Sequence, residues 1–282
     1  MNEKQLLELK KTANNIRRHV INGVYSAGCG HPGGSLSIAD ILAYLYTVEL
    51  RVDPKNPADP TRDRFVLSKG HTAPALYGAL AERGFIGKDE ITTLRRIDSR
   101  LQGHPDMKGI PGVDMSTGSL GLGFSSAVGM ALSGKHYGEP YRVYTILGDG
   151  ESQEGQVWEA AMFAAHYKLD NLVAILDLNG LQIDGDITKV MNPTPHDEKF
   201  LAFGWNVVTI NGHDFSEIEA ALNNAKEVKG KPTLVIAKTI KGRGVSFMEG
   251  RPEWHGQAPK EEQYKIALAD LDKIDEELEG GI

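Results

Sequence analysis

The sequence predicts an α/β protein in which a doubly wound, mainly parallel sheet is flanked by helices. Strand-like and helix-like runs alternate along most of the chain, the order expected of parallel strands joined by crossover helices. Residues 143–147 and 172–176 are apolar or β-prone at nearly every position, which is typical of strands covered on both faces. Each of these runs ends in a polar loop that contains glycine.

The first part of the chain is expected to be helical. Apolar residues at roughly helical spacing predict a helix from about Glu3 to Ala27, ended by the segment 28–30. His31–Gly34 is expected to be a loop. A second helix should then begin at a cap, Ser35 or Ser37, and run to about Leu50.

The remainder is expected to supply the sheet and its crossover helices, after a connection rich in Pro and Asp. The predicted strands are 64–67, 143–147, 172–176, 207–210 and 234–237. The predicted helices are 73–83, 125–133, 156–167, 215–227 and a polar amphipathic helix at 261–279. With no internal repeat or low-complexity tract visible, we expect one domain over residues 1–282.

Composition limits the classes of protein. Apolar residues make up 40% and charged residues 24%, as in ordinary soluble proteins. A net charge of -7 argues against nucleic acid or an anionic membrane as the partner. No apolar run approaches the roughly 18 residues of a membrane helix, and the N-terminus does not resemble a secretory signal. A single cysteine, Cys29, excludes an intrachain disulfide. We therefore expect a cytoplasmic protein.

Two predicted strands end in groups that suit a metal ion. Gly148-Asp149-Gly150 follows the first buried strand, and Asn179 follows the next. One helix lies between these strands, so their carboxyl ends should be neighbours, where ligands bind in open α/β sheets. Mg²⁺ prefers a few hard oxygens and completes its shell with phosphates. Gly-Asp-Gly alone is typical of a plain turn; the Asn and the flanking buried strands favour a metal and diphosphate site.

Glycine-flanked histidines form a second pattern. Five of the nine histidines have a glycine neighbour: His31, His71, His104, His213 and His255. Each alone is typical of an accessible loop. A metal cluster is one explanation, but the spacings are long and no paired Cys or His-x-x-x-His unit occurs.

These patterns resemble known proteins. Gly148-Asp149-Gly150 followed at a distance by Asn179 resembles the thiamine-diphosphate motif. Seven strings, in the order found in transketolases and spread over most of the chain, resemble that family. They are residues 26–33 (SAGCGHPG), 67–71 (LSKGH), 103–105 (GHP), 117–123 (TGSLGLG), 148–155 (GDGESQEG), 241–244 (KGRG) and 254–256 (WHG). Each string is weak by itself, and the ordered set is specific.

The resemblance implies thiamine diphosphate and Mg²⁺ as cofactors, with Ca²⁺ or Mn²⁺ able to replace Mg²⁺. It assigns the metal to the side chains of Asp149 and Asn179 and the carbonyl of Leu181. The implied cofactor-binding residues are His71, Lys241 and His255 at the diphosphate, the Gly150 backbone, and Gly118, Leu120 and Ile183 beside the thiazolium. His31, His104 and His255 are the implied catalytic residues, around the reactive carbon and the donor hydroxyls. Glu154 is expected near a subunit interface.

The chain departs from the family pattern at two places. Leu178 precedes Asn179, where the motif often has two adjacent Asn. Gly33-Gly34 stands where many relatives carry hydroxyl side chains, so a polar contact to the cofactor or donor there is not expected.

The resemblance also implies an activity and a partner. Transketolases transfer a two-carbon ketol unit from a ketose phosphate to an aldose phosphate, as in the pentose phosphate pathway. They are more than twice as long as this chain, and their second part supplies the aminopyrimidine site. We therefore expect a split transketolase. A C-terminal subunit on a separate chain would carry the aminopyrimidine site, and two chains of each kind would form a heterotetramer with sugar phosphates as substrates.

Other functions are considered for this chain: a different enzyme that uses thiamine diphosphate, or a subunit without catalytic activity. A dihydroxyacetone synthase or a deoxyxylulose-phosphate synthase half would share most of the strings. The alpha chain of a 2-oxo-acid dehydrogenase is disfavoured by His31, His104 and Trp254-His255-Gly256, because its substrates lack sugar hydroxyls. A non-catalytic cofactor-binding subunit is disfavoured because Asp149 and Asn179 are both present.

Overall fold

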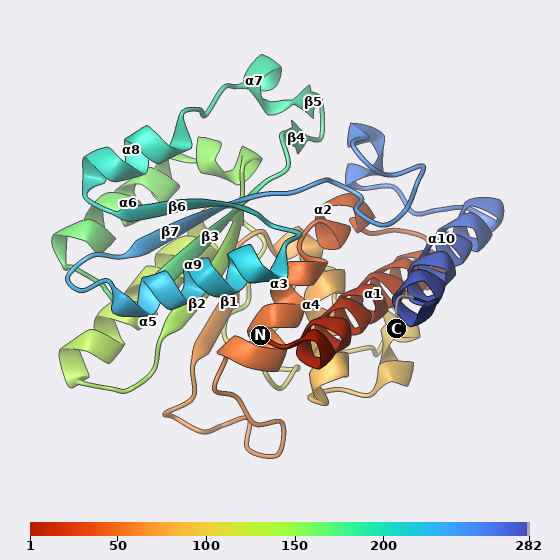
Figure 1. The fold of residues 1–282 in the computed structure, drawn as a ribbon, viewed down its shortest axis with the longest axis horizontal. Coiled ribbons are helices and arrows are strands. Elements are labelled where there is room, and N and C mark those ends of the chain that lie inside the picture. The colour runs from red at the N-terminus through yellow and green to blue at the C-terminus, as the bar shows by residue number, and fades with distance from the viewer. Residues whose placement is uncertain (281–282) are drawn as a thin grey trace.

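Five parallel strands form one sheet in the order β1–β2–β3–β7–β6 (Figure 1). The computed structural model describes residues 1–280. The strands are β1 (Arg64–Leu67), β2 (Val143–Gly148), β3 (Leu172–Leu178), β6 (Asn206–Asn211) and β7 (Thr233–Lys238). All their pairings are parallel. The predicted α/β fold with a mainly parallel sheet is confirmed.

The central strands are buried on both faces. In β3, Val173 and Ile175 belong to one hydrophobic core, whereas Leu172, Ala174 and Leu176 belong to the other. Successive side chains of a strand point to opposite faces, so a strand between two helical layers needs an apolar residue at every position. This requirement explains the continuous apolar runs in the sequence.

Helices cover both faces of the sheet (Figure 1). One core includes side chains of α1 (Glu3–Ala27), α3 (Ala39–Tyr44), α4 (Ala73–Arg83), α9 (Phe215–Glu227) and α10 (Glu261–Gly280). The other includes side chains of α5 (Leu122–Tyr137), α6 (Gly155–His166) and α8 (His196–Phe203). Within residues 1–280, no helix has the length and apolarity needed to cross a bilayer.

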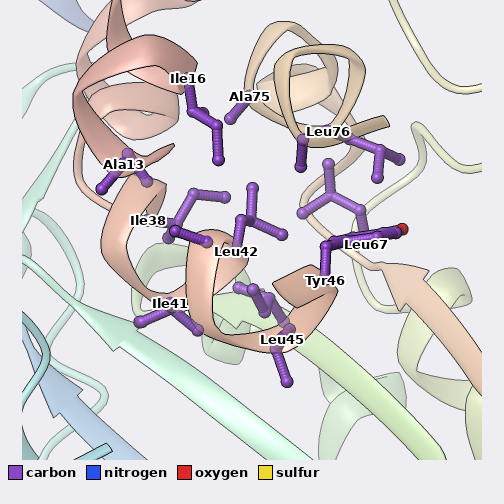
Figure 2. Close-up of a cluster of buried hydrophobic side chains, with 14 of the residues drawn as sticks. Ala13, Ile16, Ile38, Ile41, Leu42, Leu45, Tyr46, Leu67, Ala75 and Leu76 are labelled. Atoms are coloured by element: carbon purple, nitrogen blue, oxygen red, sulfur yellow. The ribbon is translucent and has the colours of Figure 1, made fainter. Parts of the chain in front are cut away.

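Packing around α3 joins the N-terminal helices to the sheet. Figure 2 shows Leu42 of α3 among side chains from α1, α4 and β1, such as Ile16, Leu76 and Leu67. All four side chains are almost fully buried. Burial of a Leu or Ile side chain contributes about 1.5–3 kcal/mol, so this cluster holds the loops at the ends of these elements in place.

Capping fixes the ends of α1. Asn2 and Gln5 form a reciprocal capping box at its start, with bonds of 2.9 and 3.0 Å. Gly28 ends the helix with φ 66°, a left-handed conformation that costs glycine little. The helix boundaries predicted from the sequence are confirmed here.

Two local predictions between residues 31 and 38 are wrong. The predicted loop His31–Gly34 is mostly helical, because α2 spans Pro32–Leu36. The predicted second helix does run to Leu50, as α3 followed by a π-helical turn, Leu45–Glu49, but its N-cap is Ile38 and not Ser35 or Ser37. Proline at the first helical position favours the start of α2. A Cβ on Gly33 would lie 2.8 Å from the carbonyl oxygen of Trp254, so close tertiary packing overrides the poor helix propensity of glycine.

Some short elements had no counterpart in the prediction. After β3 the chain forms a small antiparallel hairpin, β4 (Leu181–Gln182) with β5 (Gly185–Asp186), then α7 (Ile187–Val190) and α8. Short 3₁₀ helices occur at Gly70–Thr72, Lys88–Thr93, Gly150–Gln153 and Pro252–His255. The hairpin strands have two residues each, too few to produce a periodic pattern.

Candidate active site

A cavity of 420 Å³ opens at the carboxyl ends of β1, β2 and β3, the edge where parallel sheets bind ligands. It is lined by eleven of the twelve residues proposed from the sequence: His31, His71, Gly118, Leu120, Asp149, Gly150, Asn179, Leu181, Ile183, Lys241 and His255. His104 is the exception. Residues from widely separated segments of the chain therefore meet at one site.

The ends of β2 and β3 are joined directly. One carboxylate oxygen of Asp149 accepts the backbone N–H of Gly180 at 2.6 Å, and the other accepts that of Gly150 at 2.8 Å. Burial and the nearby Asp177 carboxylate raise the pKa of Asp149 to about 6. A buried carboxylate that is costly to ionise gains from a cation beside it.

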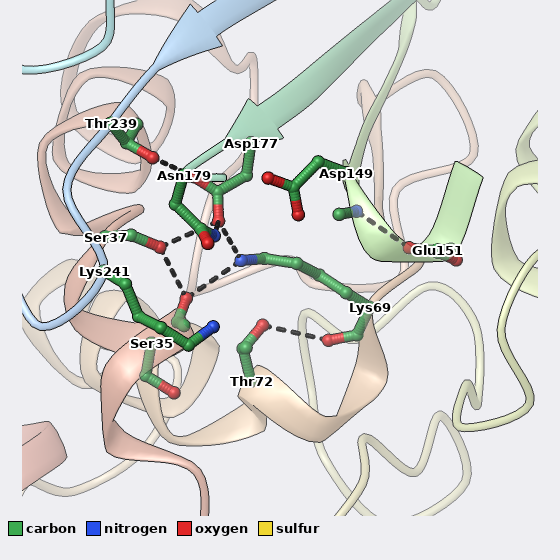
Figure 3. Close-up of polar contacts among 12 residues, drawn as sticks. Ser35, Ser37, Lys69, Thr72, Asp149, Glu151, Asp177, Asn179, Thr239 and Lys241 are labelled. Atoms are coloured by element: carbon green, nitrogen blue, oxygen red, sulfur yellow. Dashed lines mark hydrogen bonds and ion pairs between the residues drawn. The ribbon is translucent and has the colours of Figure 1, made fainter. Parts of the chain in front are cut away.

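Asp177 holds the floor of the site together (Figure 3). Its carboxylate is fully buried. It accepts a hydrogen bond from the Lys69 ammonium at 2.5 Å and another from the side-chain amide nitrogen of Asn179 at 2.9 Å. Hydroxyl groups complete its partners: Ser37 donates at 2.8 Å, and Thr239 also donates. These four partners come from four segments, so a single carboxylate positions the ends of β1, β3 and β7 and the start of α3.

Three imidazoles gather in the wall of the cavity. The ring centroids of His31, His71 and His255 lie 5.1–5.5 Å apart, with His71 and His255 nearly parallel. Burial lowers the pKa of His31 to about 4 and that of His255 to about 3, with neighbouring cations adding to the effect. At neutral pH these rings are therefore uncharged. The Nδ1 atoms of His31 and His255 are buried and have no hydrogen-bond partner within residues 1–280.

Lys241 brings a buried cation to the cavity wall. Its ammonium donates to the carbonyl of Leu181 at 3.1 Å. Burial, followed by the charge of Lys69, lowers its pKa to about 8. The loop that carries Lys241 is tied down by His213, which accepts the Ile240 N–H at 2.9 Å and bonds to Asp40 at 2.7 Å. His213, although glycine-flanked like the others, thus has a supporting position outside the cavity.

His104 lies at the rim of the site. A Cβ built on Gly118 would lie 3.2 Å from its ring, so the imidazole rests directly on a glycine that lines the cavity. The His104 side chain is otherwise exposed, and its carbonyl accepts the Tyr77 hydroxyl at 3.1 Å. Of the residues proposed from the sequence, only His104 is outside the cavity wall.

Other cavity residues were missed by sequence reasoning. Lys69 belongs to the string LSKGH, but a lysine there has no pattern that predicts a buried ion pair. The buried Glu151 accepts the backbone N–H groups of Gly121 and Gly148, both at 2.9 Å. Gln153 donates to Gln182 at 2.6 Å and holds the β4–β5 hairpin over the site. Glu154, expected from the sequence to lie near a subunit interface, is exposed at the cavity edge.

The donor set differs from a conventional metal cluster. No group of three or more His, Cys, Asp or Glu side chains arranged to hold a metal is found among the residues that the structure describes. The proposed set is instead one carboxylate (Asp149), one amide (Asn179) and one carbonyl (Leu181), from three residues that line the same cavity. Such a set leaves coordination positions open for phosphate oxygens, as Mg²⁺ sites commonly do.

Comparison with protein families gives one match over most of the chain. The family described as transketolase, thiamine diphosphate binding domain, matches residues 9–271.

Relatives of similar length are named as subunits. The chain is 49% identical over 274 residues to the 6-deoxy-6-sulfo-D-fructose transketolase subunit SqwG of Clostridium sp. (strain MSTE9), covering 97% of this chain and 99% of that protein. It is 42% identical to an apulose-4-phosphate transketolase subunit of Phocaeicola vulgatus, covering 98% and 97%. Human transketolase is 45% identical, but the match covers 90% of this chain and only 40% of the human protein.

Solved transketolases share the fold. The transketolase of Campylobacter jejuni superposes with a TM-score of 0.88 at 36% identity, covering 96% of this chain and 43% of that one. The Leishmania mexicana enzyme gives a TM-score of 0.86 at 29% identity and covers 96% and 46%. The chain therefore spans less than half the length of these enzymes.

Proposed function

Because the chain belongs to the transketolase family and matches its thiamine-diphosphate-binding domain, we propose that it is the diphosphate- and metal-binding subunit of a two-subunit transketolase. The observation that carries this proposal is the single cavity that gathers Asp149, Asn179, three imidazoles and Lys241. Its acidic and amide oxygens suit a divalent cation, and its cationic and neutral nitrogen donors suit a diphosphate.

The proposed metal site uses oxygen ligands only. Asp149 and Asn179 bind Mg²⁺ through their side chains, and Leu181 binds it through its carbonyl. The buried Asp149 carboxylate supports this assignment, because burial makes it costly to ionise unless a cation is beside it. Ca²⁺ or Mn²⁺ can replace Mg²⁺ where only oxygen ligands are required.

The proposed diphosphate site lies beside the metal. Lys241, His71 and His255 contact the diphosphate, and Gly150 contributes its backbone. The Nδ1 of His255 is buried and has no hydrogen-bond partner among residues 1–280, which fits this role because buried polar atoms normally have a partner. Gly150 fits as well, since a Cβ there would lie 3.3 Å from Gln182 and narrow the cavity. Gly118, Leu120 and Ile183 form the proposed wall beside the thiazolium.

The proposed reaction is transfer of a two-carbon ketol unit from a ketose to an aldose. Thiamine diphosphate supplies the electron sink for such carbon–carbon cleavage. His31, His104 and His255 bind the sugar hydroxyls and move protons at their oxygens. The rings of His31 and His255 are neutral at pH 7, so they can accept hydroxyl hydrogens. An anionic diphosphate beside them raises their pKa values toward neutrality, the range that suits proton transfer.

The aminopyrimidine half of the cofactor requires residues from a partner chain. Relatives covered over 97–99% of their own length are named as subunits, whereas the human enzyme extends far beyond the matched part. We therefore place the aminopyrimidine site on a separate C-terminal subunit. Glu154, exposed at the cavity edge, is suited to the subunit interface.

The proposed assembly is a heterotetramer of two copies of each chain, since closed two-fold assembly is the commonest oligomeric form. A cofactor shared across the interface should favour assembly. Light scattering on the mixture, with and without thiamine diphosphate and Mg²⁺, should show a two-plus-two mass that dissociates more readily without cofactor. An active one-to-one heterodimer would contradict the proposed tetramer. A degree of assembly that is the same with and without the cofactor would contradict the proposal that cofactor binding favours assembly.

The proposed substrates are anionic sugars. By their names, one relative acts on a sulfosugar and another on apulose 4-phosphate, so the pentose phosphates are one candidate pair among three. Assay of the assembled enzyme with 6-deoxy-6-sulfo-D-fructose, xylulose 5-phosphate or apulose 4-phosphate as the ketose donor, each with an aldose phosphate as the acceptor, tests the proposal. Transfer that requires both cofactors supports it; absence of transfer from every ketose tested would refute it.

A further inference from the structure

The segment of residues 180–196, between β3 and α8, has little apolar support. It contains β4, β5 and α7 and lies at the edge of the molecule (Figure 1). Between residues 181 and 195, only Ile187 and Pro193 are buried. The same segment carries the proposed metal ligand Leu181 near its start. Polar contacts therefore provide much of the attachment of a segment on which the proposed site depends.

Asp149 is connected to both ends of this segment. Its carboxylate accepts the Gly180 N–H at 2.6 Å, at the start. Its backbone carbonyl accepts the Ser152 hydroxyl at 2.5 Å, and the Ser152 oxygen lies 2.9 Å from Nε2 of His196, the first residue of α8. Ser152 and His196 are both buried. The residue proposed to bind the metal thus holds the start of the segment directly and its end through a hydrogen-bond chain.

The direction of this chain follows from its atoms. A serine hydroxyl has one hydrogen, and a carbonyl oxygen can only accept. Ser152 gives its hydrogen to the Asp149 carbonyl, so Nε2 of His196 must be the donor to the Ser152 oxygen. Burial, followed by the charge of Lys199, lowers the pKa of His196 to about 4. At neutral pH the ring is therefore uncharged, and its single N–H is the one that Ser152 accepts.

The middle of the segment is attached to the same short helix. Gln153 donates to the side chain of Gln182 at 2.6 Å and to the carbonyl of Met191 at 2.7 Å. Ser152 and Gln153 both belong to the 3₁₀ helix Gly150–Gln153, which directly follows Asp149. Gln153 lines the cavity, whereas Ser152 and His196 lie outside its wall. His196 can therefore influence the proposed site only through the residues that it holds.

We propose that His196 is a positioning residue for the metal and diphosphate site. Its bond to Ser152 fixes the end of segment 180–196 against the turn that follows Asp149, and so helps to fix where the Leu181 carbonyl lies. The identity of the bound group rests on the proposed function; the structural attachment does not. Because His196 touches neither the metal nor the cofactor, its loss should weaken cofactor binding and leave the chemical step nearly unchanged.

Proteolysis of the full, cofactor-free chain tests the attachment. His196→Phe removes the donor and keeps a ring, His196→Gln keeps an N–H donor, and His136→Phe makes the same change on the exposed end of α5. Trypsin cleavage after Lys189, exposed in α7, is compared with cleavage after Lys229, exposed between α9 and β7. Loss of one buried hydrogen bond should speed cleavage after Lys189 about 10-fold and leave Lys229 unchanged. His196→Gln should lie nearer the wild type, and His136→Phe should match it.

The assembled enzyme tests the consequence for the cofactor. We expect His196→Phe to raise KM for thiamine diphosphate about 10-fold, with kcat at saturating cofactor changed by less than about 3-fold. Ser152→Ala should have the same effects, and the double variant should be no worse than either single variant. Ser152→Ala removes only a hydroxyl, so it decides the question if His196→Phe fails to fold.

Three results would overturn the inference: unchanged cleavage after Lys189, equal acceleration after Lys189 and Lys229, or an unchanged KM for the cofactor. The trypsin measurement needs neither cofactor nor turnover, which separates this inference from the proposed function. Selective cleavage after Lys189 in a chain that supports no ketol transfer would refute the function and keep the attachment. Ketol transfer with wild-type cleavage and cofactor KM in the variants would do the reverse.

Discussion

Asp177 accepts the amide nitrogen of Asn179 at 2.9 Å and thereby fixes the direction in which the Asn179 amide oxygen points. The oxygen accepts the Leu181 N–H at 3.1 Å, next to the carbonyl proposed as a metal ligand. Residues that orient metal ligands commonly affect metal affinity nearly as much as the ligands do. We therefore assign Asp177 as a positioning residue.

Replacing Asp177 should weaken the metal site without touching a proposed ligand. Asp177→Asn should reduce metal-dependent thiamine diphosphate affinity by about 10- to 100-fold, measured by calorimetry on the assembled enzyme. The change also leaves the Lys69 ammonium buried without its partner, which is strongly destabilising. A second variant, Asp177→Asn with Lys69→Met, removes that charge. Undiminished metal-dependent affinity in the folded double variant would show that Asp177 does not orient Asn179.

Replacing Asp149 should abolish metal-dependent cofactor binding and leave the fold intact. Asp149→Ala removes the only carboxylate proposed to contact the ion, and the diphosphate charge is then poorly matched. The same substitution also relieves a buried acid whose pKa is raised to about 6, so thermal stability of the cofactor-free chain should not fall sharply. Calorimetry with Mg²⁺ present and absent is the measurement. Cofactor affinity equal to the wild type would refute the assignment.

Replacing His104 should affect the sugar donor far more than the cofactor. His104 lies at the rim of the cavity, on Gly118, and does not line the part around Asp149. His104→Ala should cost about 2–4 kcal/mol of transition-state stabilisation, seen in kcat/KM for the donor. Cofactor affinity in the same variant serves as the control. An equal loss in both would mean that His104 does not act at the donor hydroxyls.

The cofactor-free chain should lose stability on mild acidification partly through His255. Its pKa is about 3 in the folded chain and about 6.5 in an unfolded one. The unfolded state therefore binds the proton first, and the free energy of unfolding falls as pH drops below about 6.5. His255→Gln should flatten this slope between about pH 7 and 5 in thermal melts. His136→Gln, on the exposed end of α5, is the control; identical slopes for wild type and His255→Gln would contradict the prediction.

The sequence predicted the parts of the fold that have strong local patterns. β2 and β3 were found because both their faces are buried and nearly every position is apolar. The meeting of Asp149 with the end of β3 followed from the parallel order of the strands and is visible as its bond to Gly180. Both features can be predicted from the local hydrophobic pattern and the parallel order of the strands.

Features that depend on distant contacts could not be predicted. The pair Lys69–Asp177 joins residues far apart in the chain and has no periodic pattern. α2 contains Gly33 and Gly34, which favour a loop by propensity, and forms because Trp254 and Lys241 pack against it. His104 follows a glycine, as His31 and His71 do, yet it lies at the rim, and nothing in the local sequence pattern distinguishes it from the histidines inside the cavity.

Ketol transfer by the purified chain, alone and with its aminopyrimidine-site partner, tests the central claim most directly. Both samples should contain thiamine diphosphate, Mg²⁺ and a ketose donor that the assembled enzyme accepts. We expect no transfer by the chain alone and transfer once the partner is added, abolished by Asp149→Ala. Transfer by the chain alone, free of contaminating enzyme, would contradict the claim that it holds only the diphosphate half of the site.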